Sequence, residues 1–396
     1  MHVISHSFHV AKSKKTHTII IKSMKGYANM KKHTVNHSIN NPQNKEIHLF
    51  AAANTKDGFV SFFDKAFNHD DTKKLYILKG GPGCGKSTIM KNYGKAAEKI
   101  GMTPIYYHCS SDPDSLDGVT VKETGISIID GTAPHVFDPV YPGVRDYYVD
   151  LSCAWDKSLL EKNKGKIISL ANQKSNCYKT AYRLLNAAGK VTDEMYETAK
   201  NFIDHDKIQN FVKRFTHKYI KTKNNKSGYI SEIITDAISA KGIVRYFTLE
   251  KSAKTLFFIK NSKMSARFLF DELTKTIKKS GASAIFALSP ENPDNVIAIL
   301  LPDNGICISL FDVEMFDKFE ASGKTVKIIN SARFIIPESY KSNRQKYRFA
   351  EKCYETLRNA ALSELSGAGA FHAELEKLYI SATDYNKVNE IEKTLY

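Results

Sequence analysis

Short hydrophobic runs alternate with amphipathic stretches through most of the chain. The apolar run 75–78 is followed by a glycine-rich turn and by a helical pattern from about 86 to 100, which Gly101 ends. Further apolar runs at 103–108 and 125–129 indicate strands. A strand, a helix and another strand in succession predict a right-handed crossover and a parallel sheet. The pattern therefore predicts an α/β fold.

Longer helical patterns follow these strands. Residues 151–220 have a mostly helical pattern, and 221–228 form a polar linker. Near the C-terminus, residues 374–379 with their flanks indicate an amphipathic helix, which we expect to pack on the module that precedes it.

The second part of the chain repeats the first. Pro113 recurs as Pro293 and Gly125 as Gly305, each 180 positions apart, and the same register continues to the end of the chain. This register favours a tandem duplication over chance similarity between two α/β segments. We expect four segments: a basic extension (1–45), a P-loop module with a helical tail (46–220), a linker (221–243) and a degenerate P-loop-like module with C-terminal helices (244–396).

The net charge of +16 is concentrated at the N-terminus, where residues 1–45 hold eight lysines and no acidic residue. This segment could be a flexible basic tail or a targeting peptide. It could also result from a wrongly chosen start codon, with Met24 or Met30 as the true start. We favour a disordered or spurious extension. The remainder is mildly basic and has no aromatic-interleaved basic motif, which disfavours nucleic-acid binding.

Cysteine spacing and hydropathy limit the setting of the protein. The six cysteines are scattered and form no Cys-x-x-Cys pair, which fits a reducing cytosol better than a disulfide framework or a structural zinc site. No apolar run approaches the roughly 18 residues that span a bilayer. We therefore expect a cytoplasmic protein with no membrane contact.

The glycine-rich turn carries the strongest chemical signal. Glycines let successive backbone N–H groups surround an anionic phosphate at the positive end of the following helix. Lys86 would then reach the β- and γ-phosphates, and the Ser87 hydroxyl would bind Mg²⁺. The predicted nucleotide-binding residues are Gly80, Gly81, Pro82, Gly83, Cys84, Gly85, Lys86, Ser87 and Thr88. A small filler is the favoured role of Cys84.

Acidic residues follow two of the predicted strands. Asp130 ends the run 125–129, and an acid there can organise Mg²⁺. Asp112 and Asp114 lie in a loop that should overlook the γ-phosphate, where one of them would orient water or deprotonate a substrate hydroxyl. The alternative for both is a turn that caps its own backbone. The residue after Asp130 is Gly131, so rapid hydrolysis is not implied.

Three further side chains are weaker candidates. His108 and His135 follow the same two strands, and either could contact phosphate or substrate. For both, a structural hydrogen bond is the favoured role. Arg145 could stabilise phosphate charge, although an ion pair with a neighbouring acid is the favoured interpretation.

The corresponding turn of the second copy lacks this chemistry. When the runs 75–79 and 256–260 are aligned, Arg267 stands at the position of Lys86 and Phe268 replaces the Mg²⁺-binding hydroxyl of Ser87. The glycines are gone, and Leu310 stands where the first copy has Asp130. A phosphate cradle needs glycine for close backbone approach, and phenylalanine cannot bind a metal. The sequence therefore predicts one active and one degenerate module.

The run 79–88 is similar to the phosphate-binding loop of the P-loop NTPase superfamily. Segments 108–118, 130–135 and 371–376 more narrowly resemble a poorly characterised bacterial family of tandem P-loop proteins, usually labelled ATPase or nucleotide-kinase-like. The resemblance covers about residues 47–396 and implies the fold and a nucleotide ligand, but no established substrate. Members of that family generally keep a glycine loop in both copies, and this chain departs by losing the second.

These observations predict a Mg²⁺-dependent ATP-binding protein that hydrolyses ATP with its first module. One alternative is a small-molecule or nucleotide kinase that uses Asp112 or Asp114 as the acceptor-side base. Another is an ATP-gated interaction or scaffold protein with little hydrolysis, which the degenerate second copy favours. The sequence indicates a nucleoside triphosphate as the partner and names no protein partner.

Overall fold

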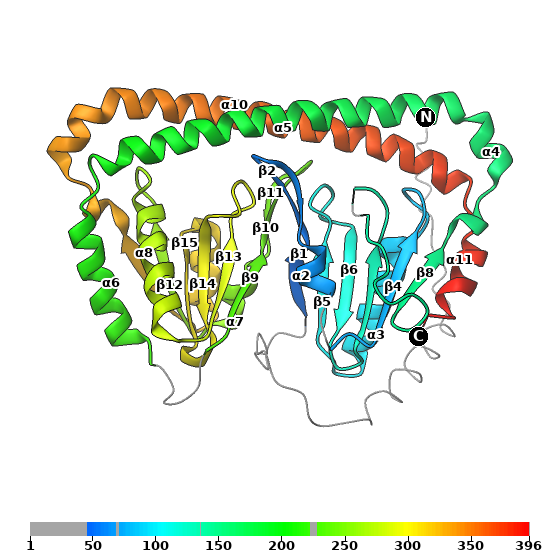
Figure 1. Ribbon diagram of the computed structural model, residues 1–396, viewed down its shortest axis with the longest axis horizontal. Helices are drawn as coiled ribbons and strands as arrows, with labels where there is room; N and C mark the ends of the chain where they lie inside the picture. Colours follow the sequence, from blue (N-terminus) through cyan, green and yellow to red (C-terminus); the bar gives the residue numbers. More distant parts are fainter. Residues whose placement is uncertain (1–45, 69–70, 135, 222–227, 396) are drawn as a thin grey trace, which may run out of the picture.

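The computed structural model describes residues 46–68, 71–134, 136–221 and 228–395. The predicted extension at 1–45 and the candidate His135 therefore lie outside the described residues. The described residues form one 12-stranded sheet and two small hairpins, below a pair of long helices that spans the whole molecule (Figure 1).

The large sheet consists of two half-sheets with the same strand order. The first half-sheet has the order β1-β5-β6-β7-β4-β8, and the second has β9-β13-β14-β15-β12-β16. The first contains β1 (Ile47–Phe50), β4 (Lys74–Lys79), β5 (Pro104–His108), β6 (Leu116–Val121), β7 (Ile126–Asp130) and β8 (Asp146–Asp150). The second contains β9 (Ile230–Ile234), β12 (Thr255–Lys260), β13 (Ala284–Leu288), β14 (Val296–Leu301), β15 (Ile306–Leu310) and β16 (Thr325–Asn330).

The sheet is mixed, so the prediction of a parallel sheet is only partly right. β4 is parallel to β7 and to β8, but β6 is antiparallel to both of its neighbours, β5 and β7. β14 is likewise antiparallel to β13 and β15, and β1 meets β9 antiparallel. Short turns join β5 to β6 and β6 to β7, and such turns connect antiparallel strands without a crossover helix.

Two hairpins and short helices complete each half. The hairpins are β2 (Ala52–Thr55) with β3 (Gly58–Ser61), and β10 (Asp236–Ser239) with β11 (Gly242–Arg245). Most of residues 230–243 of the predicted linker therefore belong to strands β9, β10 and β11. The short helices are α2 (Phe63–Phe67), α4 (Lys157–Lys162), α7 (Thr248–Ser252), α9 (Val313–Ala321), η1 (Ser152–Ala154), η2 (Pro302–Asn304) and η3 (Ser331–Phe334).

The helices that follow β4 and β12 begin at corresponding places. These are α3 (Lys86–Lys99) and α8 (Ser265–Ser280). The sequence prediction of a helix from about Lys86, ended by Gly101, is confirmed: Gly101 has a positive φ of 83°, where glycine is favoured.

Two long antiparallel helices connect the half-sheets. α5 (Lys164–Lys200) leads from the first half-sheet to α6 (His205–Tyr219), which packs on α8 of the second. α10 (Pro337–Ser381) runs back along α5 and leads to α11 (Tyr385–Glu392), which packs on the first half-sheet (Figure 1). The expectation that the C-terminal helix packs on the preceding module is therefore wrong. Each half-sheet is therefore covered by a helix that follows one of the two long helices: α11 on the first half-sheet and α6 on the second.

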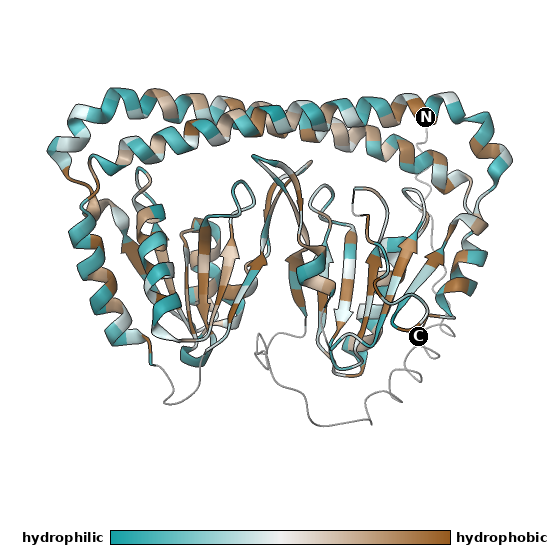
Figure 2. Ribbon diagram, in the orientation of Figure 1, coloured by the Kyte–Doolittle hydropathy of each residue, from teal (hydrophilic) through white to brown (hydrophobic). Residues whose placement is uncertain are grey.

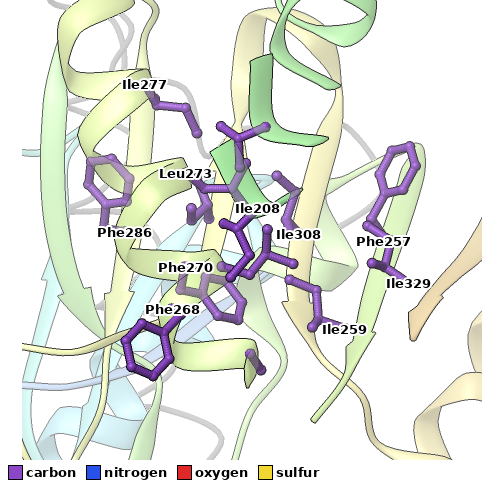
Figure 3. Packing of buried hydrophobic residues seen from close by; sticks show 14 of the residues in the cluster. Ile208, Phe257, Ile259, Phe268, Phe270, Leu273, Ile277, Phe286, Ile308 and Ile329 are labelled. Carbon is purple, nitrogen blue, oxygen red and sulfur yellow. The ribbon is translucent and has the colours of Figure 1, made fainter. Parts of the chain in front are cut away.

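The hydrophobic core divides along the same lines. Hydrophobic residues are concentrated on the strands, whereas α5 and α10 carry a mixture of polar and apolar residues (Figure 2). In the second half-sheet, Ile208 of α6 shares one buried cluster with Leu273 of α8 and Ile308 of β15 (Figure 3). Burial of these side chains fixes α6 on the second half-sheet, because apolar area removed from water is the main stabilising term in folding.

Candidate functional site

The glycine-rich turn lies between β4 and α3, at the carboxyl end of the strand. Gly83 and Gly85 have φ of 71° and 96°, a left-handed backbone that favours glycine. Gly85 is the N-cap of α3, and no side chain caps the helix there. The loop therefore brings backbone N–H groups to the positive end of a helix, as anion binding requires.

Lys86 is the buried cation of this loop. Its side chain is only 10% exposed, and its Nζ donates to the carbonyl oxygens of Gly80 and Gly81, each at 2.8 Å. The same Nζ lies 3.5 Å from Oδ2 of Asp130. Cys84 is buried beside it, and burial raises the pKa of the Cys84 thiol, which therefore stays neutral. The lysine charge is thus held between the loop and the end of β7.

The sheet register brings Asp130 to the loop. β7 is the neighbour of β4, and the Cα atoms of Leu78 and Asp130 are paired across the two strands. Oδ1 of Asp130 accepts a hydrogen bond from the backbone N–H of Thr132 at 2.8 Å, which orients the carboxylate.

Ser87 is the second residue of α3, directly after Lys86. Its Oγ accepts a hydrogen bond from the N–H of Leu116 at 3.0 Å. Mg²⁺ usually takes one or two protein oxygens, with water and phosphate oxygens completing an octahedron. Ser87 and Asp130 fit that donor set. No group of three or more potential metal-ligating His, Cys, Asp or Glu side chains occurs in the part of the chain that the structure describes, so a cage of such ligands is not what these residues offer.

Asp112 and Asp114 are both paired with a lysine from elsewhere in the chain. Lys241, in the turn between β10 and β11, forms an ion pair with Asp112 at 3.3 Å and also contacts Asp114. Asp112 additionally accepts a hydrogen bond from Ser115 at 2.9 Å. The structure therefore pairs both Asp112 and Asp114 with a lysine of the second half.

His108 and Arg145 take the structural roles that the sequence favoured. Nδ1 of His108 is 2.7 Å from the Pro113 carbonyl oxygen, and its Nε2 is 2.8 Å from Nδ1 of His48. Burial lowers the pKa of His108 to about 4, so the ring is neutral at pH 7. Arg145 forms an ion pair with the buried carboxylate of Asp146, with Nε and Oδ1 2.5 Å apart.

The C-terminal helices cover the loop, which the sequence did not predict. A Cβ on Gly81 would lie 2.7 Å from the ring of Tyr379, and one on Gly83 would lie 2.8 Å from Ile380. The hydroxyl of Tyr385 in α11 donates to the carbonyl oxygen of Gly83 at 2.6 Å. The loop glycines therefore also allow the end of α10 to pack against the backbone. These contacts join residues some 300 positions apart. They depend on the path of α10 across the molecule, which cannot be predicted from local sequence pattern.

Three titratable side chains of the long helices are partly buried. Glu376 and His372 lie one turn apart on α10, and Lys174 lies on α5. None of the three has a hydrogen-bond or ion-pair partner within residues 46–395 as described. Burial raises the pKa of Glu376, lowers that of His372 to about 4 and lowers that of Lys174. The charges that act on Glu376 are those of Asp112, which raises its pKa further, and of Lys86, which lowers it.

The equivalent loop of the second half-sheet is built differently. Four residues, 261–264, join β12 to α8, whereas six, 80–85, join β4 to α3. The one-to-one alignment of Arg267 with Lys86 is therefore wrong, because α8 begins at Ser265 and Arg267 is its third residue. Arg267 instead lies over the ring of Tyr196 in α5, 4.1 Å from its centre.

Side chains close this second loop. The hydroxyl of Ser265 lies 2.7 Å from that of Ser331, and Oδ1 of Asn261 accepts a hydrogen bond from the N–H of Ala266 at 3.2 Å. Lys263 is paired with both carboxylate oxygens of Glu351, each at 2.9 Å. The polar groups at the start of α8 are thus occupied by the protein itself.

Comparison of the chain with protein-family models, with curated proteins and with solved structures gave no match. Among the helices of the described residues, none is both long and apolar enough to span a membrane.

Proposed function

We propose that this protein binds one Mg²⁺–ATP at the loop 80–88 and hydrolyses it. The observation that carries the proposal is the convergence of three elements. A glycine loop with left-handed turns precedes α3, the buried ammonium of Lys86 stands at the start of that helix, and Asp130 ends the adjacent strand with its carboxylate 3.5 Å from the ammonium. Each of these features has a role in phosphate chemistry, and they come from two separate parts of the chain, the segment 80–86 and the end of β7.

In this proposal, each residue has a distinct task. The loop N–H groups hold the phosphate oxygens, and the ammonium of Lys86 exchanges its bonds to Gly80 and Gly81 for bonds to phosphate. Ser87 and Asp130 would hold Mg²⁺, which neutralises charge on the phosphates when bound. The hydroxyl of Tyr385 donates a hydrogen bond to the Gly83 carbonyl oxygen and so satisfies one acceptor of the loop.

Hydrolysis is favoured over a kinase reaction. The residues that a kinase would use as its acceptor-side base, Asp112 and Asp114, are both held by Lys241. The hydrogen bond from Lys241 lowers the pKa of the Asp114 carboxyl, which makes this carboxylate a weaker base.

An ATP-gated interaction is the second candidate, and the packing of α10 and α11 favours it. The end of α10 touches Gly81 and Gly83, and the same helix runs across to the second half-sheet. Any change in the loop on nucleotide binding would therefore act on a helix that both half-sheets share. This role is compatible with slow hydrolysis.

We also propose that the half-sheets are tandem copies of one module and that the second copy has lost its nucleotide site. The identical strand order and the 180-residue register support this proposal.

The test is calorimetric titration of Mg²⁺–ATP into the full chain, with phosphate release followed on the same sample. The proposal expects saturable binding and phosphate release without an added acceptor. Absence of binding would contradict it, and binding without release would leave the ATP-gated role.

A further inference from the structure

The helix α10 brings Glu376 to the loop that precedes Lys86. The backbone carbonyl oxygen of Glu376 would be 3.2 Å from a Cβ on Gly83, so this turn of α10 lies directly on the loop. One turn further, Tyr379 covers Gly81 and packs edge-on against Trp155, with ring centres 5.6 Å apart. The position of Glu376 is therefore fixed from both sides.

The Glu376 side chain belongs to the turn of α10 that lies on the loop. It is partly buried, and the charges that act on it are those of Lys86 in the loop and Asp112 in the 109–115 loop. It has no hydrogen-bond or ion-pair partner among the residues that the structure describes. A partly buried carboxylate without a partner carries a desolvation cost, and such groups are concentrated at functional sites.

The other acidic residues near the loop are already engaged. Asp130 lies against Lys86 and Thr132, and Asp112 and Asp114 are paired with Lys241. The residue after Asp130, where many ATPases carry a water-activating glutamate, is Gly131. Among these acidic residues near the loop, Glu376 is thus the one whose carboxylate has no hydrogen-bond or ion-pair partner in the described residues.

We infer that Glu376 is the general base for ATP hydrolysis at the first half-sheet, supplied by the helix that follows the second half-sheet. This inference rests on the proposed function. The carboxylate accepts a proton from water as the water oxygen forms a bond to the γ-phosphorus. The bond between that phosphorus and the bridging oxygen of ADP breaks, its electron pair leaves with ADP, and the proton on Glu376 passes to solvent.

The properties of Glu376 suit this task. Burial and the charge of Asp112 raise the pKa of its carboxyl, which brings its basicity closer to neutral pH. The assignment also gives the second half of the chain a role in catalysis without a nucleotide of its own. A fragment that ends before α10 would then lack the general base.

The experiment compares Glu376→Gln with Glu374→Gln in the full chain. Glu374 lies on the same helix but is paired with Lys377 at 2.5 Å, so it controls for the loss of a charge on α10. Mg²⁺–ATP affinity is measured by calorimetry, phosphate release by single-turnover kinetics, and folding by thermal unfolding. Glu376→Asp, which retains a shorter carboxylate, separates chemistry from packing.

We expect Glu376→Gln to slow phosphate release by about 100-fold or more, as loss of a general base does, with affinity unchanged within about threefold. Glu376→Asp should recover part of the rate, and Glu374→Gln should match the wild type. Wild-type turnover in Glu376→Gln, or a loss confined to affinity, would overturn the inference and leave the proposed function standing. Binding without turnover in the wild type would also overturn it. Absence of binding in the wild type would overturn both.

Discussion

The loop between β4 and α3 and the loop between β12 and α8 stand at the same place in two half-sheets of identical order, yet their contacts differ. In both, the residue before the helix has a left-handed backbone, Gly85 with φ of 96° and Met264 with φ of 66°. The bend therefore belongs to the fold. Glycine content and loop length differ between the two loops. These two differences distinguish a loop that can surround a ligand from one that is filled by its own side chains.

The same comparison extends to the charges. Lys86 faces Asp130 across the first loop, and α10 adds Glu376 without a partner in the described residues. In the second half, Lys263 is paired with Glu351, and Arg245 is paired with Glu250 at 3.0 Å. Charges that satisfy one another hold a structure together, whereas a partly buried carboxylate without a partner remains available for chemistry.

The largest expected effect is a difference between Lys86→Ala and Arg267→Ala in how much Mg²⁺–ATP stabilises the protein. A ligand that binds only the folded protein stabilises it by about 2.7 kcal/mol at 100 times its dissociation constant. We expect Mg²⁺–ATP to raise the unfolding temperature of the wild type and of Arg267→Ala, but not that of Lys86→Ala. Thermal unfolding with and without nucleotide measures this within each variant, so any stability cost of Arg267→Ala itself cancels. A rise in the unfolding temperature of Lys86→Ala with Mg²⁺–ATP would contradict nucleotide binding at the first loop.

The sequence was sufficient for the parts of the site that are local. The glycine loop, the start of α3 at Lys86 and the strand that ends at Asp130 were all predicted within a few residues, because each depends on short-range pattern. The roles of Tyr379, Tyr385 and Glu376 were not predicted, since they depend on the path of a 45-residue helix across the molecule. Arg267 was misplaced because a two-residue difference in loop length is invisible to an ungapped alignment.

A smaller effect tests the packing of α10 on the first loop. In Gly81→Ala the new methyl group would meet the ring of Tyr379 at 2.7 Å, and Trp155 restricts the movement of that ring. We expect a loss of about 1–3 kcal/mol in the free energy of unfolding, measured with urea. Gly165→Ala in α5 is the matched control: nothing lies within 4 Å of its Cβ position, so it should gain about 0.5–1 kcal/mol. Equal stability of the two variants would mean that α10 does not press on the loop.

Asp236 tests the buried charges of the second half by their pH dependence. Burial raises the pKa of Asp236 to about 6, although the charge of Arg245 opposes the shift. Because this pKa is higher in the folded than in the unfolded chain, the stability that Asp236 contributes falls as pH rises from about 4 to about 6.

The free energy of unfolding of Asp236→Asn, relative to that of the wild type, should therefore be about 2 kcal/mol higher at pH 7 than at pH 4.5. Urea unfolding at the two pH values measures the difference, and Asp57→Asn, at an exposed position, provides the control. A difference of the opposite sign would contradict a raised pKa.

The smallest expected effect concerns Lys241, which ties the second half to the 109–115 loop. Its partner Asp114 is largely exposed, so Lys241→Ala should cost less than about 1 kcal/mol of stability. If Asp112 and Asp114 are structural, phosphate release should change by no more than about threefold. A larger rise in activity towards an added hydroxyl acceptor would favour the kinase reaction instead.

The stoichiometry of Mg²⁺–ATP binding to the full chain tests the asymmetry of the two loops most directly. The account predicts one nucleotide per chain, retained in Arg267→Ala and lost in Lys86→Ala. Two nucleotides per chain, or one that survives Lys86→Ala, would contradict it.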